Sequence, residues 1–249
     1  MKKILLLITL VVLTGCIGAG EDLPNAQEIV DRSIDASGGG RYANSKISFS
    51  FRNRRYEMEP ANTGRILRRI TRTDTTLVTD ILSGSEFERK ADGKRLPVPD
   101  TMATRYANSV NSVHYFAYLP YGLNDRAVNK KYLDTVSLEG RSYYKVEITF
   151  DKEGGGKDFE DTYVYWFNTS TYKPDFLAYD YNVDGGGVRF RKAFNERYIN
   201  GIRFVDYENY SFEKRVKPAK MDSLYRRGLL SLESKIELKD IQVSPDSGN

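Results

Sequence analysis

The feature that most constrains the fold is an alternation of apolar and polar residues, clearest over 144–150. The even positions are apolar or aromatic, and the odd positions are polar: Tyr144, Val146, Ile148 and Phe150 alternate with Lys145, Glu147 and Thr149. Successive side chains of a strand point to opposite faces of its sheet, so this spacing predicts a strand with one buried face. Similar segments recur from Lys46 onward and are separated by turn residues. The pattern therefore predicts a mainly β (α+β) fold of consecutive antiparallel hairpins.

Further strands are expected on both sides of this segment. Their predicted ranges are 46–52, 63–73, 76–82, 86–90, 162–167, 176–183, 188–194, 202–212 and 234–243. The apolar parity changes between Phe51 and Tyr56, which predicts a bulge or turn at 53–55. Asn200-Gly201 is a strong two-residue hairpin signal. The segment 162–167 is apolar on both faces and contains the single tryptophan, Trp166, so we expect a central strand.

Two helices are expected to cover this sheet, and a third, short one over 218–228. The first spans about 25–37, with Asn25 as N-cap, and three glycines end it. The second begins near Asp100 as N-cap, and Pro120 and Gly122 end it. Its apolar stripe is Met102, Tyr106, Val110, Val113 and Ala117. Its last turns add His114, Tyr115, Phe116 and Tyr118, so this helix is a candidate lid. The rings either pack the helix against the sheet or contact a ligand.

The N-terminus predicts export and lipid anchoring. Lys2 and Lys3 precede an apolar run over 4–12, and Leu13-Thr14-Gly15-Cys16 follows as a lipoprotein processing site. We expect a signal peptide at 1–15, a lipidated tether at 16–22 beginning with Cys16, one domain at 23–243 and a disordered tail at 244–249. Acylation would anchor the chain to a membrane without a spanning segment. The alternative is an ordinary secretory leader with an incidental cysteine, and the chain is exported in either case.

Composition argues against several functional classes. The formal charge of +4 falls to +2 when Lys2 and Lys3 leave with the leader, and both signs are mixed, so we expect no nucleic-acid partner. A single cysteine leaves no disulfide partner. His114 is the only histidine and has no nucleophile elbow nearby, so we interpret it as a helix-surface or interface residue. We expect no zinc, interpret the acidic run at 151–161 as solvated charge rather than a calcium site, and predict no cofactor.

The mature chain resembles a known family over most of its length, through the lipoprotein processing site, the short helix ended by glycines and the antiparallel strands interrupted by a helix. The run from Tyr165 to Pro174, followed by the Gly186–Phe190 and Asn200–Ile202 segments, is similar to the LolA/LolB-type lipoprotein carriers and their uncharacterised outer-membrane lipoprotein relatives. The resemblance implies an incomplete β-barrel, a curved antiparallel sheet whose concave face is covered by helices and can enclose acyl chains. The resemblance also implies that the protein is located at the outer membrane of a Gram-negative bacterium. No functional residue of the carriers is transferred to this sequence.

These observations lead to a functional hypothesis of lipid binding without catalysis. Each buried methylene contributes roughly 0.8 kcal/mol, so a cavity can hold a lipid or lipoprotein acyl chain without a charged contact. The candidate ligand contacts are Met102, Tyr106, Val110, Val113, Phe116, Tyr144, Val146, Ile148, Phe150 and Trp166. The alternative is a structural or protein-binding envelope lipoprotein that uses the 179–181 and 189–191 faces. An enzyme is less favoured, and an aldolase would need alternating strands and helices that are not seen here.

Overall fold

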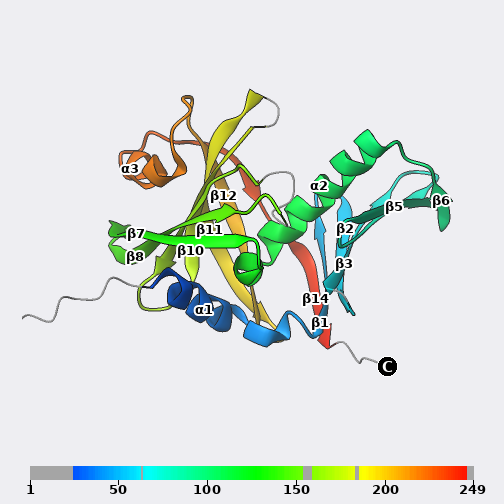
Figure 1. Cartoon of the computed structure of the whole chain (residues 1–249), viewed down its shortest axis with the longest axis horizontal. Helices are drawn as coiled ribbons and strands as arrows, with labels where there is room; N and C mark the ends of the chain where they lie inside the picture. Colours follow the sequence, from blue (N-terminus) through cyan, green and yellow to red (C-terminus); the bar gives the residue numbers. More distant parts are fainter. Residues whose placement is uncertain (1–24, 63, 154–158, 183–184, 246–249) are drawn as a thin grey trace, which may run out of the picture.

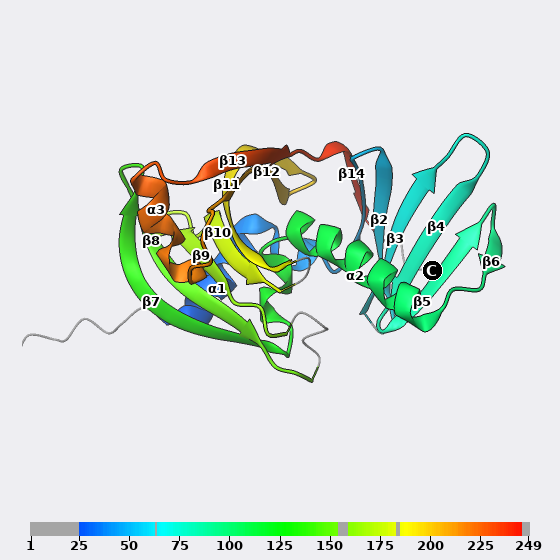
Figure 2. The same cartoon turned by 90° about the horizontal axis from the view of Figure 1, so that it is seen from above.

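The computed structural model describes residues 25–62, 64–153, 159–182 and 185–245. Within these residues the chain forms two antiparallel sheets of seven strands each, with α2 between them (Figures 1 and 2). The two sheets do not close into a barrel. The expectation of a mainly β fold, a curved antiparallel sheet forming an incomplete barrel with helices over it, is therefore confirmed. The signal peptide, Cys16 and the tether lie outside the described residues.

The first sheet contains the N-terminal half of the chain and the last strand. Its order is β14 (Lys239–Pro245), β1 (Ser45–Phe51), β2 (Arg54–Ala61), β3 (Gly64–Arg72), β4 (Leu77–Ser83), β5 (Glu86–Ala91) and β6 (Lys94–Leu96). The expected change of parity after β1 is a two-residue turn, in which Arg52 and Asn53 have φ values of 47° and 58°. The turn places Phe49 opposite Tyr56, so both rings face the same core.

The second sheet contains the C-terminal half. Its order is β13 (Ser231–Ile236), β12 (Ile202–Ser211), β11 (Gly187–Ile199), β10 (Pro174–Tyr181), β9 (Tyr163–Asn168), β8 (Arg141–Phe150) and β7 (Val128–Leu138). Strand β7 was not predicted from the sequence, because this edge strand is largely exposed and shows little alternation of apolar and polar residues. Asn200 and Gly201 make the predicted hairpin turn between β11 and β12, with φ values of 48° and 79°.

The C-terminal segment joins the two sheets, and the prediction of one closing strand at 234–243 is wrong. β13 pairs with β12, with Ile236 opposite Tyr207, and β14 pairs with β1, with Val243 opposite Ile47. The link between them is held by Asp206, whose Oδ1 accepts the Leu238 N–H at 2.9 Å. The predicted single strand is two strands, because the chain passes here from the edge of the second sheet to the edge of the first. β14 continues through Pro245, two residues into the segment expected as a tail.

The helices begin and end close to their predicted positions. α1 (Ala26–Ser37) starts at the expected N-cap, where the Asn25 side chain accepts the Gln27 N–H at 2.9 Å. α2 (Asp100–Ala117) includes Asp100 as its first residue, so the expectation of Asp100 as N-cap is wrong. The extended residue Pro99 takes that place, because its carbonyl accepts the first helical N–H groups, those of Met102 and Ala103. α3 (Met221–Arg226) follows a single 3₁₀ turn, η4 (Pro218–Lys220).

The central part of the second sheet is buried on both faces. α1 and the end of α2 pack on one face, over Val146, Ile148, Tyr165 and Phe167, and this cluster is the main core. The opposite face, which includes Trp166, packs against Met221 of α3. Burial on both sides explains the continuous apolar character of β9, an interior strand between β8 and β10.

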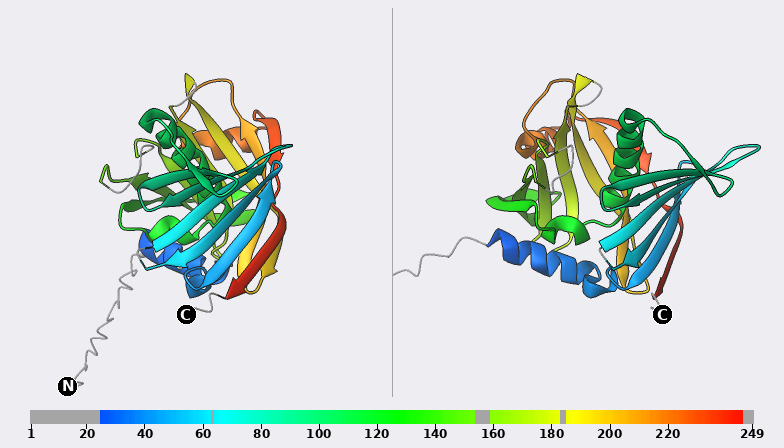
Figure 3. Two further views of the ribbon diagram at one scale, coloured as in Figure 1. Left: turned by 90° about the vertical axis from the view of Figure 1, so that its right-hand side faces the viewer. Right: turned by 45° about the vertical axis from the view of Figure 1, so that its right-hand side comes forward.

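Helix α2 connects the two sheets. Its N-terminal half crosses β3, β4 and β5, and its last turn enters the core of the first sheet with Ala117 and Tyr118. Tyr115 reaches the second sheet, where its hydroxyl lies 2.8 Å from that of Tyr165. Figure 3 shows the first sheet turned away from the second with this helix between them. In the part of the chain described, every helix is too short or too polar to cross a membrane.

Candidate ligand-binding site

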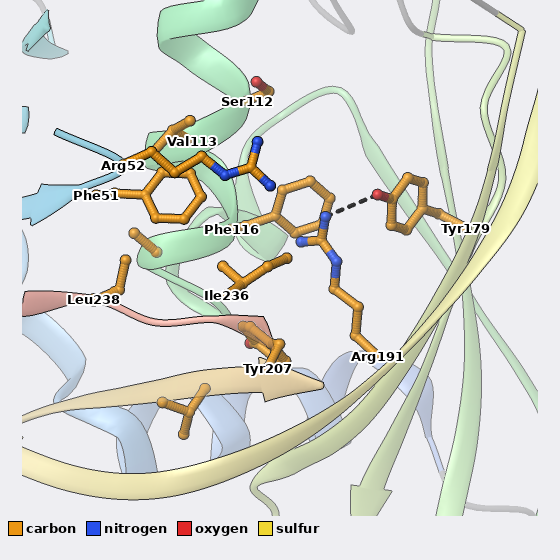
Figure 4. Close-up of a pocket in the computed structure, with 12 residues that line it drawn as sticks. Phe51, Arg52, Ser112, Val113, Phe116, Tyr179, Arg191, Tyr207, Ile236 and Leu238 are labelled. Carbon is orange, nitrogen blue, oxygen red and sulfur yellow. Dashed lines mark hydrogen bonds between the residues drawn. The ribbon is translucent and has the colours of Figure 1, made fainter. Parts of the chain in front are cut away.

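A cavity of about 270 Å³ lies between the two sheets, beside the C-terminal half of α2 (Figure 4). Val113, Phe116 and Ala117 of α2 line it together, because residues three and four apart share one face of a helix. Ser112 of α2 also lines it, and the remaining lining comes from the β1–β2 hairpin, the second sheet and the link between β13 and β14: Phe51, Arg52, Tyr179, Arg191, Val205, Tyr207, Ile236 and Leu238. Segments that are distant in the sequence thus meet around one space.

Most of this wall is apolar. Val205, Tyr207 and Leu238 are buried, and Ile236 packs against the main core. Burial raises the pKa of the Tyr207 hydroxyl above its usual range, so this side chain stays neutral at physiological pH. Small-molecule pockets commonly measure about 300–1,000 Å³ and are lined mainly by apolar groups. At about 270 Å³ the cavity is slightly smaller than that range, and it suits an apolar group of modest size.

Arg191 on β11 brings a positive charge to the cavity. Its Nη2 donates to the Tyr179 hydroxyl at 2.8 Å and its Nε donates to Asn209 Oδ1 at 3.3 Å. The guanidinium also lies 3.8 Å from the centre of the Phe116 ring, within cation–π range. The side chain is thus held against α2 by one ring and two neutral hydrogen-bond partners.

A second hollow continues from the cavity at Phe51 and Arg52. It has a volume of about 660 Å³ and opens around the β1–β2 turn. Its charged lining is mainly basic: Arg52, Arg54, Arg55, Arg72, Lys235 and Lys239, with Glu237 and Asp240. Arg52 is exposed and lies above the Phe51 ring at 5.1 Å. The mouth of the cavity therefore faces a positively charged surface.

A larger hollow, of about 1,100 Å³, follows the other side of α2. Its lining mixes Tyr115 and Phe150 with Asn108, Asp125 and Lys152. Burial raises the pKa of the Asp125 carboxyl, although Arg65 opposes this effect. With such a mixed lining, this hollow matches an apolar ligand less well than the smaller cavity does.

The structure brings only some of the predicted contact residues to the cavity. Val113 and Phe116 line it. Val110 is fully buried but does not line it. Met102 and Tyr106 lie near the start of α2, where the Tyr106 ring packs 6.0 Å from Phe87 on β5.

The predicted residues of β8 and β9 lie elsewhere. Val146 and Ile148 are inside the main core, and Tyr144 and Phe150 pack at its margin. Trp166 faces away from α2, and its indole Nε1 donates to Asp222 Oδ2 of α3 at 3.3 Å.

Two residues at the site were interpreted differently from the sequence. The alternative hypothesis from the sequence used the 179–181 and 189–191 faces as an exposed contact surface, but Arg191 is buried and Tyr179 half-buried. Both lie on a sheet face that α2 covers. The alternation of Tyr and Arg is the same whether water or a helix covers such a face, so the sequence held no signal for this burial.

His114 lies at the interface between α2 and the first sheet and is buried. Its Nδ1 is 3.0 Å from the Tyr118 hydroxyl, and its Nε2 is 3.0 Å from the Arg68 carbonyl oxygen. Neither nearby serine bonds to the ring, since Ser109 Oγ accepts from Arg69 and Ser112 Oγ donates to the Ser109 carbonyl. Among described residues, no group of three or more His, Cys, Asp or Glu side chains is placed to hold a metal ion.

Comparisons with known proteins give a family and a set of similar folds. A family model described as "Family of unknown function (DUF6503)" matches residues 42–238. No curated protein matches the chain.

Among solved structures, the chain is similar to a LolA superfamily protein from Nitrosomonas europaea, at 14% identity and a TM-score of 0.45, over 89% of this chain and 92% of that one. It is also similar to a putative outer membrane lipoprotein-sorting protein domain from Vibrio parahaemolyticus, at 10% identity and a TM-score of 0.44, over 88% and 94% of the two chains. No site residue is transferred from these structures.

Proposed function

This chain belongs to the DUF6503 family of unknown function, and we propose that it is an exported, membrane-anchored envelope lipoprotein that binds an acyl chain or a similarly apolar ligand. The observation that supports this proposal is the cavity beside α2, with its largely apolar wall. Burying about six methylenes would contribute roughly 5 kcal/mol, which corresponds to submillimolar affinity before any polar contact is added.

The proposed anchor is the acylated Cys16. An apolar leader followed by a small-residue cleavage site and a cysteine indicates lipid attachment at the new N-terminus. An acyl anchor would keep the domain next to a membrane, where apolar ligands are available. We assign the protein to the outer membrane of a Gram-negative bacterium on the resemblance stated for the sequence.

We further propose that the protein is not an enzyme. Its single histidine is enclosed between Tyr118 and the Arg68 carbonyl, and the cavity holds no general base next to Ser112. Burial lowers the pKa of His114 to about 4, so the ring is neutral at physiological pH, and the hydroxyls of the two nearby serines, Ser109 and Ser112, bond to other groups.

The test is saturable binding of a fluorescent fatty acid to mature protein from which co-purifying lipid has been removed. Val113→Trp places a larger side chain in the cavity and is expected to weaken binding about tenfold or more, because the space for the chain is taken. Met102→Trp on the same helix is the matched control, since Met102 does not line the cavity. If the protein has neither co-purified lipid nor saturable binding, the proposed function is wrong.

A further inference from the structure

Three arginines are buried in the described chain, and one of them lacks a carboxylate partner. Arg69 pairs with Asp80 at 2.6 Å, and Arg203 pairs with Glu196 at 2.6 Å. Arg191 is only 8% exposed, yet its hydrogen-bond partners are the neutral Tyr179 and Asn209. A buried charge is costly unless it is paired, so the fold leaves one positive charge uncompensated beside the cavity.

The guanidinium of Arg191 retains a free donor group. Nε and Nη2 are engaged, whereas Nη1 makes no hydrogen bond to a described residue. In Figure 4 this second terminal nitrogen lies beside Phe116, on the side away from Tyr179. This nitrogen is not among the fully buried side-chain atoms of the described chain that lack a partner, so it keeps some exposed surface, and Arg191 is part of the cavity lining. Arginine is suited to carboxylates and phosphates because its N–H groups form a planar fork.

A second cation lies on the same side of the cavity. Arg52 lines the cavity from the β1–β2 turn, and it forms no ion pair with any residue that the structure describes. Figure 4 shows its guanidinium extending past Phe51 towards the region of Phe116 and Arg191. The basic hollow beyond Arg52 would also attract an approaching anion.

From this arrangement we infer that the cavity takes an amphiphile with an anionic headgroup, a carboxylate or a phosphate, which Arg191 and Arg52 bind while the apolar tail occupies the wall formed by α2 and the second sheet. The inference rests on the proposed function and adds the charge class of the ligand. A neutral lipid would contact the apolar wall of the cavity but would leave Arg191 without a counter-ion.

The test compares ligands that share one chain and differ in headgroup. Dodecanoate, dodecyl phosphate, dodecanol and dodecyltrimethylammonium are titrated into the mature, lipid-free protein below their micelle concentrations, with acetate and inorganic phosphate as anions without a tail. A charge-assisted hydrogen bond predicts that the two anionic amphiphiles bind about tenfold to a hundredfold more tightly than dodecanol. The tail-free anions are expected to bind far more weakly than either.

Variants then assign the preference to Arg191. Arg191→Gln is expected to bring the affinity for dodecanoate close to that for dodecanol, and Arg191→Lys to keep part of the difference. Arg189→Gln is the matched control, because Arg189 is on the same strand but lies over Tyr181, outside the cavity. The control should keep the full preference of the wild type.

The outcomes separate the two proposals. Equal affinity for dodecanoate and dodecanol, or tighter binding of the cationic amphiphile, would overturn the headgroup inference and leave apolar ligand binding standing. Tail-free anions that bind as tightly as dodecanoate would also overturn it, by showing a simple anion site. If no amphiphile binds, the proposed function itself fails. The preference is measured on unmodified protein, so it decides the question even if Arg191→Gln does not fold.

Discussion

His114 is the chain's only histidine, and its burial gives the folded protein a defined response to acid. The ring is 1% exposed, and burial lowers its pKa from 6.5 to about 4. Between these values the unfolded chain binds a proton that the folded chain does not, so stability rises with pH across this range. Acidification from neutral pH to about pH 4 should therefore remove about 3 kcal/mol of unfolding free energy through this group.

The measurement is urea unfolding of wild type and His114→Gln between about pH 4 and pH 7. We expect the variant to show the flatter profile, because glutamine has no proton to gain. Burial raises the pKa of Asp125 and of Asp175, and these groups act with the opposite sign. They are common to both proteins and cancel in the difference. Parallel profiles would contradict the prediction.

Among the elements, α2 is held to the first sheet by a buried ion cluster. Asp80 on β4 accepts hydrogen bonds from Arg69 and from Arg89, the closest at 2.6 Å to each. Arg69 also donates to Ser109 of α2 at 2.6 Å, and the Arg89 guanidinium lies 3.5 Å from the Tyr106 ring centre. One carboxylate thus positions two arginines, and both contact the helix that lines the cavity.

Removing that carboxylate should destabilise the helix contact and the sheet together. Asp80→Asn leaves two guanidinium groups without their counter-ion, and we expect a loss of about 3–5 kcal/mol in unfolding free energy. Glu88→Gln on the adjacent strand is the control, because Glu88 pairs with Lys90 at the surface and such pairs contribute about 1 kcal/mol or less. Equal losses in denaturant unfolding would show that the cluster has no special role.

In the fold as a whole, local features were predictable from the sequence and long-range ones were not. The Asn200-Gly201 hairpin followed from sequence because only two residues determine such a turn. The pairing of β14 with β1 joins residues about two hundred positions apart, and an alternating pattern does not specify its partner. The burial of Arg191 depends on α2 lying over that face of the second sheet. Because the position of the cavity depends on this long-range packing, only Val113 and Phe116 of the ten predicted contact residues line it.

The proposed acyl anchor at Cys16 is tested on the full-length protein in cells. Cys16→Ser removes the thiol that acylation requires, and we expect the protein to move from the membrane fraction to the soluble envelope fraction with its fold unchanged. Two acyl chains bind a membrane stably, whereas the described domain offers no spanning helix to replace them. Thr14→Ser keeps a small residue before the cleavage site and should remain in the membrane fraction. If Cys16→Ser protein also remains there, the chain is held by another contact, and the basic surface around Arg52 becomes the first region to test.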